Sequence, residues 1–454
     1  MPHPWICPFC PLHCEDVKIE RQAEGARMIA PECSLAQAAI KRLDLDRKEP
    51  RPSRIKGEIV DRHAAIQYVA ERLNDASEIA LRGSLTGLGT ARSVLGFAER
   101  VGAAIDHDAF ETQNALRRTV ARDGVFSATL GDVRRYADLV VLIGRPEKDF
   151  PRLVDRFCVD GLIEGRSRQI VSLVPALADS IHREQASGIP TDASFERLTI
   201  APERFSDFLA AIRVHIQGQA ADRAAGLDQQ TSAQLQRLTG WLDAANYVAV
   251  VLGPTALDAF GPFGAEVEAA GLIASIRAFN EERRAVLLSI DPSLSFRQAA
   301  LWRSGFSGPV RWQQGVPGPL ERGQFEALWE SPGTVRLRIE CSPGARFARS
   351  LSSGEGRATT DRSATARAKI LLAVEGVSEE AVREADAFLP IAAPGIDLAD
   401  AVVRGDGTVS LPLTSVRSPL EPSLAETLTA LSEAGRADRG LAYNRSRESN
   451  SEPK

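Results

Sequence analysis

The stretch LVVLI at Leu139–Ile143, closed by Gly144, decides the fold class of this chain. A strand with apolar side chains at every position is buried on both faces, which is typical of a parallel strand in an α/β sheet. Strands alternating with helical stretches predict doubly wound parallel sheets. Comparable runs, each followed by a helical stretch, occupy residues 78–81, 170–174, 248–252, 286–290, 335–339 and 370–374.

The amino-acid composition indicates the broad class of protein. The chain has 454 residues, 44% hydrophobic and 25% charged, which indicates a globular protein of several packed units. Its formal net charge of −5 and the lack of a long basic run argue against nucleic acid as a main partner. No apolar stretch approaches the about 18 residues that cross a membrane. The N-terminus lacks the basic-then-apolar pattern of a secretory signal, so we expect a cytoplasmic protein.

The pattern predicts five segments. Residues 1–52 form a small cysteine-containing domain that ends in a polar boundary, and residues 53–215 form a first α/β domain. A polar stretch at 216–240 is expected to be an exposed helix or linker. Residues 241–433 form a second α/β region, and the Arg-, Ser- and Asn-rich end at 434–454 is expected to be a disordered tail.

Four of the six cysteines fall within the first 33 residues: Cys7, Cys10, Cys14 and Cys33. In a reducing compartment such a group is typical of metal binding rather than of a disulfide framework. The C-x2-C-x3-C spacing lets one turn direct three sulfurs to one place, and Cys33 arrives from a separate segment. This disposition favours a four-iron, four-sulfur cluster.

Two other states of the cysteine group stay open. Structural zinc sites more often pair two C-x2-4-C knuckles, and Cys33 has no close cysteine partner, yet zinc remains the alternative metal. His13 could replace a thiolate in a zinc site, although its place between Cys10 and Cys14 predicts that the ring faces outward. The group could also be an unoccupied remnant. Cys158 and Cys341 are expected to be buried apolar thiols.

Residues 83–90 read GSLTGLGT and join a strand to a helix, where backbone amides can bind phosphate or another anion. The G-x3-G-x-G spacing matches neither the dinucleotide fingerprint nor the P-loop. It favours a tight strand-to-helix connection, while a cofactor across the sheet edge remains an alternative.

Histidine and carboxylate patterns predict no catalytic residue. No histidines pair as H-E-x-x-H or H-x-H, so a mononuclear hydrolase site is unsupported. The compact triplet Asp106-His107-Asp108 is expected on the surface. Glu379 and Glu380 are expected at a helix start, where they serve the helix dipole.

Several blocks of sequence resemble the B-type subunit of formylmethanofuran dehydrogenase, within the molybdopterin and tungstopterin oxidoreductases. The resemblance extends from about residue 7 to residue 413. It implies a molybdopterin-oxidoreductase-like α/β fold in which a small N-terminal cysteine-cluster domain precedes the parallel sheets. The blocks are residues 129–133 (TLGDV), 137–144 (ADLVVLIG), 150–152 (FPR), 300–306 (ALWRSGF), 315–318 (GVPG) and 384–391 (EADAFLPI).

The chain departs from the redox-active members of that family at the metal ligand. There a cysteine or selenocysteine, placed before the TLG segment, ligates tungsten or molybdenum; here residues 110–118 read FETQNALRR, with Thr112 at that position. A hydroxyl cannot replace a soft thiolate on such a metal without a large change in chemistry. Arg145 stands where the family usually has Asn, and Arg297 stands near another expected Asn. The resemblance therefore implies that the molybdenum or tungsten pterin is absent.

A relative of the dehydrogenase subunit without this ligand resembles the B-type subunit of the bacterial formyltransferase/hydrolase complex. That family passes a formyl group from formyltetrahydromethanopterin to a methanofuran-type carrier, whose hydrolysis releases formate. The resemblance implies a non-redox structural subunit, not itself catalytic, that meets the carrier only indirectly. Its partners would be a formyltransferase, a hydrolase and a protein similar to the C-type subunit of the dehydrogenase. The alternatives are a redox-active B-type dehydrogenase subunit and an electron-transfer protein that carries the N-terminal cluster alone.

Overall fold

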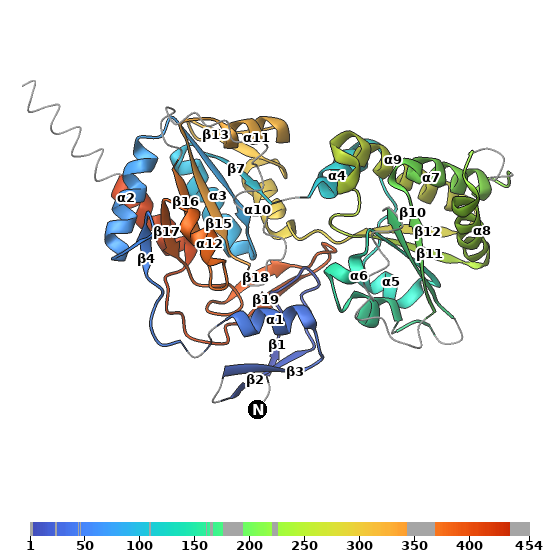
Figure 1. Cartoon of the computed structure of the whole chain (residues 1–454), viewed down its shortest axis with the longest axis horizontal. Coiled ribbons are helices and arrows are strands. Elements are labelled where there is room, and N and C mark those ends of the chain that lie inside the picture. Colours follow the sequence, from blue (N-terminus) through green and yellow to red (C-terminus); the bar gives the residue numbers. More distant parts are fainter. Residues whose placement is uncertain are drawn as a thin grey trace, which may run out of the picture. The chain divides into compact units, whose positions relative to one another are not determined.

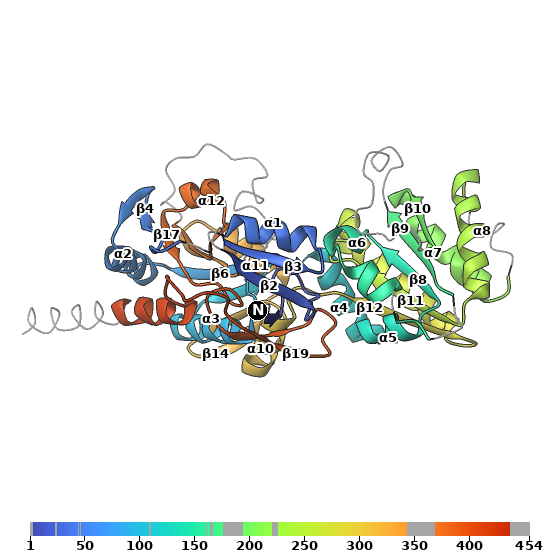
Figure 2. The ribbon, with the colours of Figure 1, turned by 90° about the horizontal axis from the view of Figure 1, so that it is seen from below.

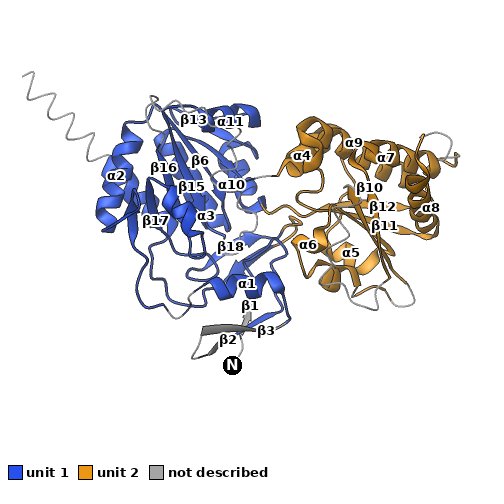
Figure 3. Ribbon diagram, viewed as in Figure 1, with its two compact units in different colours: residues 1–108, 293–404, 410–454 blue, residues 109–292, 405–409 orange. Residues whose placement is uncertain are grey.

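The computed structural model describes residues 3–22, 25–43, 45, 47–108, 110–159, 161–163, 167–175, 194–219, 226–342 and 368–435. The chain divides into two compact units (Figure 3): unit 1 comprises residues 1–108, 293–404 and 410–454, and unit 2 comprises residues 109–292 and 405–409. This division differs from the successive domains 53–215 and 241–433 expected above. The reason is strand pairing between distant segments, because the strand at 78–84 pairs with the strand at 334–340.

The N-terminal module, residues 3–43, belongs to unit 1. Its antiparallel sheet has the order β1 (His3–Trp5), β2 (Val17–Gln22) and β3 (Gly25–Ala30), and helix α1 (Ser34–Arg42) follows. Val17 and Ile19 are buried while Lys18 between them is exposed, as their alternation predicts.

Unit 1 is built on a nine-stranded sheet whose centre is parallel and whose edges are antiparallel (Figure 1). Gly83 allows its two middle strands to approach, since a Cβ there would lie 1.7 Å from the carbonyl oxygen of Ile339. In spatial order the strands are β14 (Val316–Pro319), β13 (Val310–Gln313), β7 (Ala104–His107), β6 (Glu78–Ser84), β15 (Thr334–Glu340), β16 (Lys369–Ala373), β17 (Ala387–Pro390), β4 (Ser53–Ile55) and β5 (Glu58–Val60).

Helices cover both faces of this sheet. Figure 2 shows α3 (Leu88–Val101) and α12 (Glu379–Glu384) on opposite faces. Helix α11 (Arg322–Glu330) packs its aromatic rings on Ala80 and Ala104. Ser378 caps α12, so Glu379 and Glu380 lie at a helix start as predicted. The remaining elements of unit 1 are α2 (Arg62–Asn74), α10 (Leu294–Ser304), the hairpin of β18 (Asp400–Val403) and β19 (Ser410–Leu413), and a C-terminal helix over residues 424–435.

Unit 2 contains a five-stranded parallel sheet in the order β10-β9-β8-β11-β12. The chain starts at the central strand, β8, winds outward to one edge, then returns to β11, which is the doubly wound topology that the sequence predicts. The bounds are β8 (Leu139–Ile143), β9 (Gln169–Pro175), β10 (Phe195–Ile200), β11 (Tyr247–Leu252) and β12 (Arg284–Ser289).

The stretch expected as an exposed helix or linker is helical from residue 229, but this helix packs into the core of unit 2 instead of being exposed. Its second half enters α8 (Gln229–Ala244), whose Leu235, Leu238 and Leu242 are buried against the sheet's helices. The polar residues on the outer side of α8 outnumber these leucines, so the composition of the segment does not reveal the helical repeat of its buried face. The other helices are α4 (Glu111–Asp123), α5 (Leu130–Tyr136), α6 (Pro146–Asp149), π-helical η1 (Val154–Val159), α7 (Pro202–Ile216), the 3-10 turn η4 (Asp258–Phe260) and α9 (Gly261–Phe279).

The seven predicted strands all occur, with ends that shift by a few residues. Residues 434 and 435 of the expected tail are helical, and residues 436–454 lie outside the described part of the chain. Across the residues that the structure describes, the search for a helix with the length and hydropathy of a membrane span finds none.

Candidate functional site

The first candidate site is the cysteine group of the N-terminal module. Cys7, Cys10 and Cys14 lie on the turn that follows β1, and Cys33 is the residue before α1. The turn is closed by backbone hydrogen bonds from Cys7 N–H to the Cys14 carbonyl (3.0 Å) and from His13 N–H to the Cys10 carbonyl (3.1 Å). Cys10 is half-buried and the other three are buried. The fold thus gathers all four predicted ligands in one small module.

The electrostatics of these thiols show that they share one locality. Burial raises the pKa of Cys7, and the neighbouring thiols of Cys10, Cys14 and Cys33 raise it further. Opposing this, backbone N–H groups donate to the sulfurs: Phe9 to Cys7, and Leu12 to Cys10. Donors aimed at sulfur stabilise the thiolate, the form that binds a metal.

The donor set fits a thiolate-bound group. A cation at this place would offset the burial and mutual repulsion that now raise the thiol pKa values. This fit rests on the chemistry of the donors and not on their geometry, because among the described residues no group of three or more His, Cys, Asp or Glu side chains is placed to hold a metal ion.

His13 does not face outward, which corrects the sequence-based expectation. Its backbone has φ +42, the residue is 6% exposed, and its Nδ1 donates to the Cys7 carbonyl at 3.1 Å. Burial lowers the pKa of His13 to about 4, so the ring is neutral at physiological pH. The left-handed backbone turns the side chain inward, a feature that spacing alone does not encode.

A tryptophan fixes the module on the rest of unit 1. Trp5 Nε1 donates to the carbonyls of Gly395 (3.0 Å) and Thr414 (3.2 Å), and its ring meets Phe9 edge to face. Gly395 has φ +76, and a Cβ there would lie 3.1 Å from the Pro8 ring. The cysteine turn is therefore held against the segment around Gly395, between β17 and β18.

The second site is the Thr112 position in unit 2. Thr112 lies in the first turn of α4 and is fully buried. Its Oγ1 donates to Asp258 Oδ1 (2.8 Å) and accepts the Leu257 backbone N–H (2.8 Å). The hydroxyl uses both its proton and a lone pair to join α4 to the segment before α9, so it has a structural role at this position.

The glycine loop of residues 83–90 is a strand-to-helix connection whose anion-binding groups face a carboxylate of the chain. Asp400 accepts the N–H of Gly89 (2.8 Å), the N–H of Thr90 (3.1 Å) and the Thr90 hydroxyl (2.9 Å). A Cβ on Gly87 would lie 2.2 Å from Asp400 Oδ2, which explains why the loop needs glycine there. The carboxylate occupies the N-terminus of α3, where an external anion would bind.

The triplet Asp106-His107-Asp108 is buried, which corrects the expectation of a surface position. Arg338 donates to Asp108 Oδ1 at 2.8 Å and to Glu340 Oε1 at 2.5 Å, and Ser84 Oγ donates to Glu340 Oε2 at 2.7 Å. We call Ser84, Asp108, Arg338 and Glu340 the β6–β15 network. The arginine and glutamate lie on a strand far away in sequence, so no local motif identifies this network.

The other residues that the sequence analysis singled out are part of the folded framework. Cys158 and Cys341 are fully buried, as expected. Arg145 has φ +62 and precedes α6, while Arg297 is buried on α10 with Nε donating to Ser293 Oγ at 2.5 Å.

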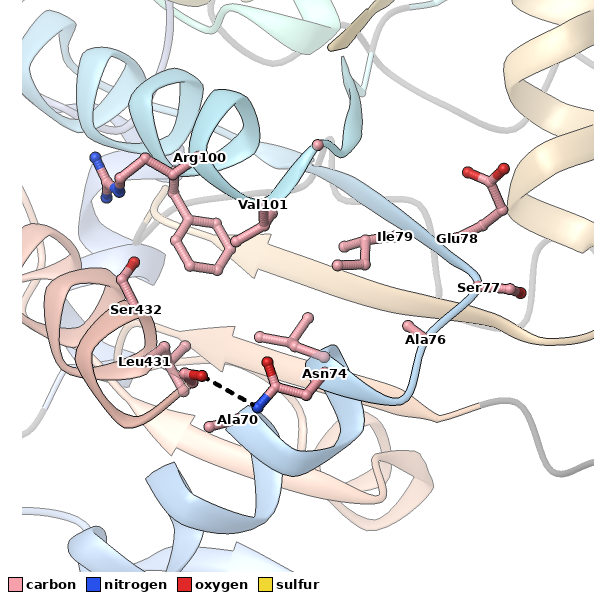
Figure 4. A pocket seen from close by; sticks show the side chains of 14 residues that line it. Ala70, Asn74, Ala76, Ser77, Glu78, Ile79, Arg100, Val101, Leu431 and Ser432 are labelled. Carbon is pink, nitrogen blue, oxygen red and sulfur yellow. Dashed lines mark hydrogen bonds between the residues drawn. The ribbon is translucent and has the colours of Figure 1, made fainter. Parts of the chain in front are cut away.

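Unit 1 contains a cavity of about 190 Å³ at the ends of α2 and α3 (Figure 4). The sequence did not single it out, because its walls come from three segments that are far apart in the chain, within residues 70–79, 97–102 and 431–435. Its lining combines apolar and polar groups and includes Leu73, Asn74, Ile79, Phe97, Arg100 and Leu431.

Comparison with known proteins agrees with this fold. No family model matches the chain. The B-type subunit of the tungsten-containing formylmethanofuran dehydrogenase 2 of Methanocaldococcus jannaschii is 23% identical, over 93% of this chain and 95% of that protein. One chain of the formyltransferase/hydrolase complex of Methylorubrum extorquens, solved with methylofuran, matches with a TM-score of 0.63 and 20% identity, covering 86% of this chain and 99% of that one. Acetylene hydratase of Pelobacter acetylenicus matches with a TM-score of 0.50 and 13% identity, covering 95% and 69%.

The α/β fold is that of the molybdopterin-type oxidoreductases, as the sequence predicted. Within that class, the resemblance to the B-type subunit of formylmethanofuran dehydrogenase is confirmed, since the match to the Methanocaldococcus protein spans nearly both chains.

Proposed function

We propose that this chain is a non-redox structural subunit of a formyltransferase/hydrolase complex. In that role it mounts a formyltransferase, a hydrolase and a protein similar to the C-type subunit of the dehydrogenase, and it meets the methanofuran carrier only through them. The complex transfers the formyl group of formyltetrahydromethanopterin to methanofuran and releases formate. The relationship to the B-type dehydrogenase subunit and the fold of the Methylorubrum complex support a one-carbon role.

The non-redox assignment depends on one observation, the hydrogen bonds that the Thr112 hydroxyl already makes. At the position where the resemblance places a tungsten or molybdenum ligand, the hydroxyl bonds Asp258 and the Leu257 N–H, both at 2.8 Å. Ligation would break the hydrogen bond to the Leu257 N–H or the one to Asp258 and leave a buried polar group unpaired, at a cost of about 1–3 kcal/mol. The neutral oxygen would also be a poor ligand for such a metal.

We propose further that Cys7, Cys10, Cys14 and Cys33 hold a four-iron, four-sulfur cluster, with zinc as the alternative. The shared locality of the thiols and the N–H donors aimed at Cys7 and Cys10 support this assignment. When bound, the group would cross-link the turn after β1 to the start of α1. Its role in this proposal is structural.

Metal and activity measurements on the assembled complex test the proposal. The chain is co-expressed with its sibling subunits, purified without oxygen, and analysed for tungsten, molybdenum, iron and zinc. We expect formyl transfer with release of formate, no tungsten or molybdenum, and no formate-dependent dye reduction. Tungsten or molybdenum near one atom per chain, or dye reduction by the complex, would establish instead the second candidate, a redox-active B-type dehydrogenase subunit, which the tungsten-containing relative favours.

A further inference from the structure

We infer that the surface formed by the end of α3 and the end of α10 in unit 1 is where a sibling subunit docks, by a segment that places an apolar side chain next to a carboxylate. This inference rests on the proposed function, because it assigns a surface to the assembly proposed there. We call it the α3–α10 surface, and it consists of Arg100 with the cavity beside it, Leu301, Trp302 and Arg303.

The surface carries an exposed tryptophan that the fold does not use. Trp302 is 67% exposed and Leu301 is 49% exposed, at the end of an amphipathic helix whose preceding residues Ala299 and Ala300 are buried. A large indole at such exposure contributes little to folding, whereas tryptophan is enriched among the residues that dominate binding energy at interfaces.

Two guanidinium groups, one of them from Arg303, the residue after this tryptophan, meet over α3. A Cβ built on Gly96 would lie 3.4 Å from Arg303 Nη2 and 3.5 Å from Arg100 Nη1, so both cations approach one point on α3. Glu99 compensates one of them, since its Oε2 lies 2.8 Å from Arg303 Nε. Like charges at this spacing repel, and a second carboxylate would relieve the repulsion.

That second carboxylate is not supplied within the part of unit 1 that the structure describes. No described carboxylate forms an ion pair with Arg100. Glu78, the acidic residue on the cavity rim, is paired with Arg311 at 2.5 Å. The surface therefore carries one uncompensated positive charge, and charge complementarity selects an acidic partner.

The cavity next to Arg100 determines the rest of the partner's chemistry. In Figure 4, Arg100 and Val101 of α3 lie above the cavity, with Asn74, Leu431 and Ser432 on the opposite wall. Its volume of about 190 Å³ exceeds the about 150 Å³ that admits a benzene ring in an engineered core. An aromatic or branched side chain can contact the apolar members of the lining, Leu73, Ile79 and Phe97, while a neighbouring Asp or Glu reaches Arg100. Arginine and tryptophan are both enriched among the residues that anchor protein interfaces.

Assembly with purified sibling subunits tests this surface. Arg100→Glu and Trp302→Ala are each expected to weaken association at least tenfold in analytical ultracentrifugation, while leaving the unfolding temperature of the chain unchanged. The matched controls are Arg383→Glu, at an exposed arginine of α12, and Ile59→Ala, at a side chain as exposed as Trp302 (67%). Both controls should assemble like the unsubstituted chain.

Hydrogen exchange on the unsubstituted protein gives a second readout that does not depend on any variant. Residues 97–102 and 300–304 should gain protection in the complex compared with the isolated chain. Normal assembly of both variants, or unchanged exchange, would overturn the inference while leaving the proposed function standing. Complete protection of these residues in the isolated chain would also overturn the inference, because this chain itself would then cover the α3–α10 surface. Self-association of the chain that Trp302→Ala abolishes would overturn it for the same reason. If the unsubstituted chain binds none of the sibling subunits, the proposed function itself fails.

Discussion

Thr112 and Asp258 are joined twice in unit 2: the Thr112 backbone N–H and its hydroxyl both donate to Asp258 Oδ1 at 2.8 Å. The same hydroxyl accepts the N–H of Leu257, so one side chain connects the first turn of α4 to the turn before α9. A fully buried group with this many partners is a structural element of the unit.

Thr112→Val removes the hydroxyl at nearly constant shape. The Leu257 N–H loses its acceptor and Asp258 loses one donor, so we expect the free energy of unfolding to fall by about 1–3 kcal/mol. Urea denaturation measures the change. Thr112→Ser keeps the hydroxyl and should stay within about 1 kcal/mol of the parent. Equal stability of the Val variant would show that the hydrogen bonds to Asp258 and Leu257 contribute nothing.

The cysteine module should depend on each of its thiols. Cys10→Ser is expected to lose the bound metal, because a serine hydroxyl is a poor substitute for a thiolate. Metal analysis and the visible absorbance of protein purified without oxygen measure the loss. An iron-sulfur cluster predicts a brown parent protein and a colourless variant.

Cys158→Ser provides the matched control for Cys10→Ser. Cys158 is fully buried in η1 of unit 2, and no other thiol is among the groups that influence its pKa, so it is not part of the cysteine group of the N-terminal module. This variant should retain the metal. A colourless parent with stoichiometric zinc would replace iron by zinc in our assignment, and full retention of metal in Cys10→Ser would place the metal elsewhere.

Local patterns predicted the strands well, because burial on both faces demands an uninterrupted apolar run such as Leu139–Ile143. The same information did not predict how the sheets are assembled. β6 pairs with β15 across more than half of the chain, and only this long-range pairing defines unit 1.

The site residues also fall into two groups, those that a local sequence pattern indicates and those that only long-range contacts define. The four cysteines are a candidate metal site that spacing alone indicates, since three of them lie on one turn, and their metal binding stays a prediction. The roles of Asp400 and Arg338 left none, because each reaches its partners from a distant segment. The burial of Asp106 and Asp108 was missed for this reason: three consecutive polar residues look like a surface loop unless the arginines that surround them are known.

Asp106 should make the stability of the chain depend on pH. Burial raises its pKa from 3.8 to about 6, against the opposing effect of Arg322, Arg82 and Arg297. Because the folded-state pKa lies above the unfolded value, the favourable contribution is complete below about pH 3.8 and is lost as pH rises through about 6. The buried charge then costs about 3 kcal/mol at pH 7.5.

Asp106→Asn removes this titration while it keeps an acceptor for the His107 N–H. We expect the variant to gain about 2 kcal/mol relative to the parent between pH 4.5 and pH 7.5, measured by urea denaturation at both values. Asp75→Asn, at an exposed residue after α2, should show no such change. A difference between Asp106→Asn and the parent that is independent of pH would contradict the raised pKa.

Arg338 is the centre of the β6–β15 network, and its loss should be the most damaging of these substitutions. It donates to both oxygens of Asp108 and to Glu340, and all three side chains are buried. Arg338→Met leaves two buried carboxylates without their cation, for which we expect a loss of about 3–5 kcal/mol. Arg383→Met, at the exposed arginine of α12, should cost less than about 0.5 kcal/mol.

Acid pH should partly rescue Arg338→Met. Burial already raises the pKa of Glu340, and Arg338 is the largest influence that lowers it, so removal of the arginine raises this pKa further. Protonation as pH falls then neutralises a carboxylate that has lost its partner, and the stability deficit should shrink between pH 8 and pH 5. The triple variant Asp108→Asn, Arg338→Met, Glu340→Gln should recover most of the loss at every pH, since it removes the charges together. A deficit that stays constant with pH and persists in the triple variant would mean that the arginine acts by filling space rather than by pairing charge.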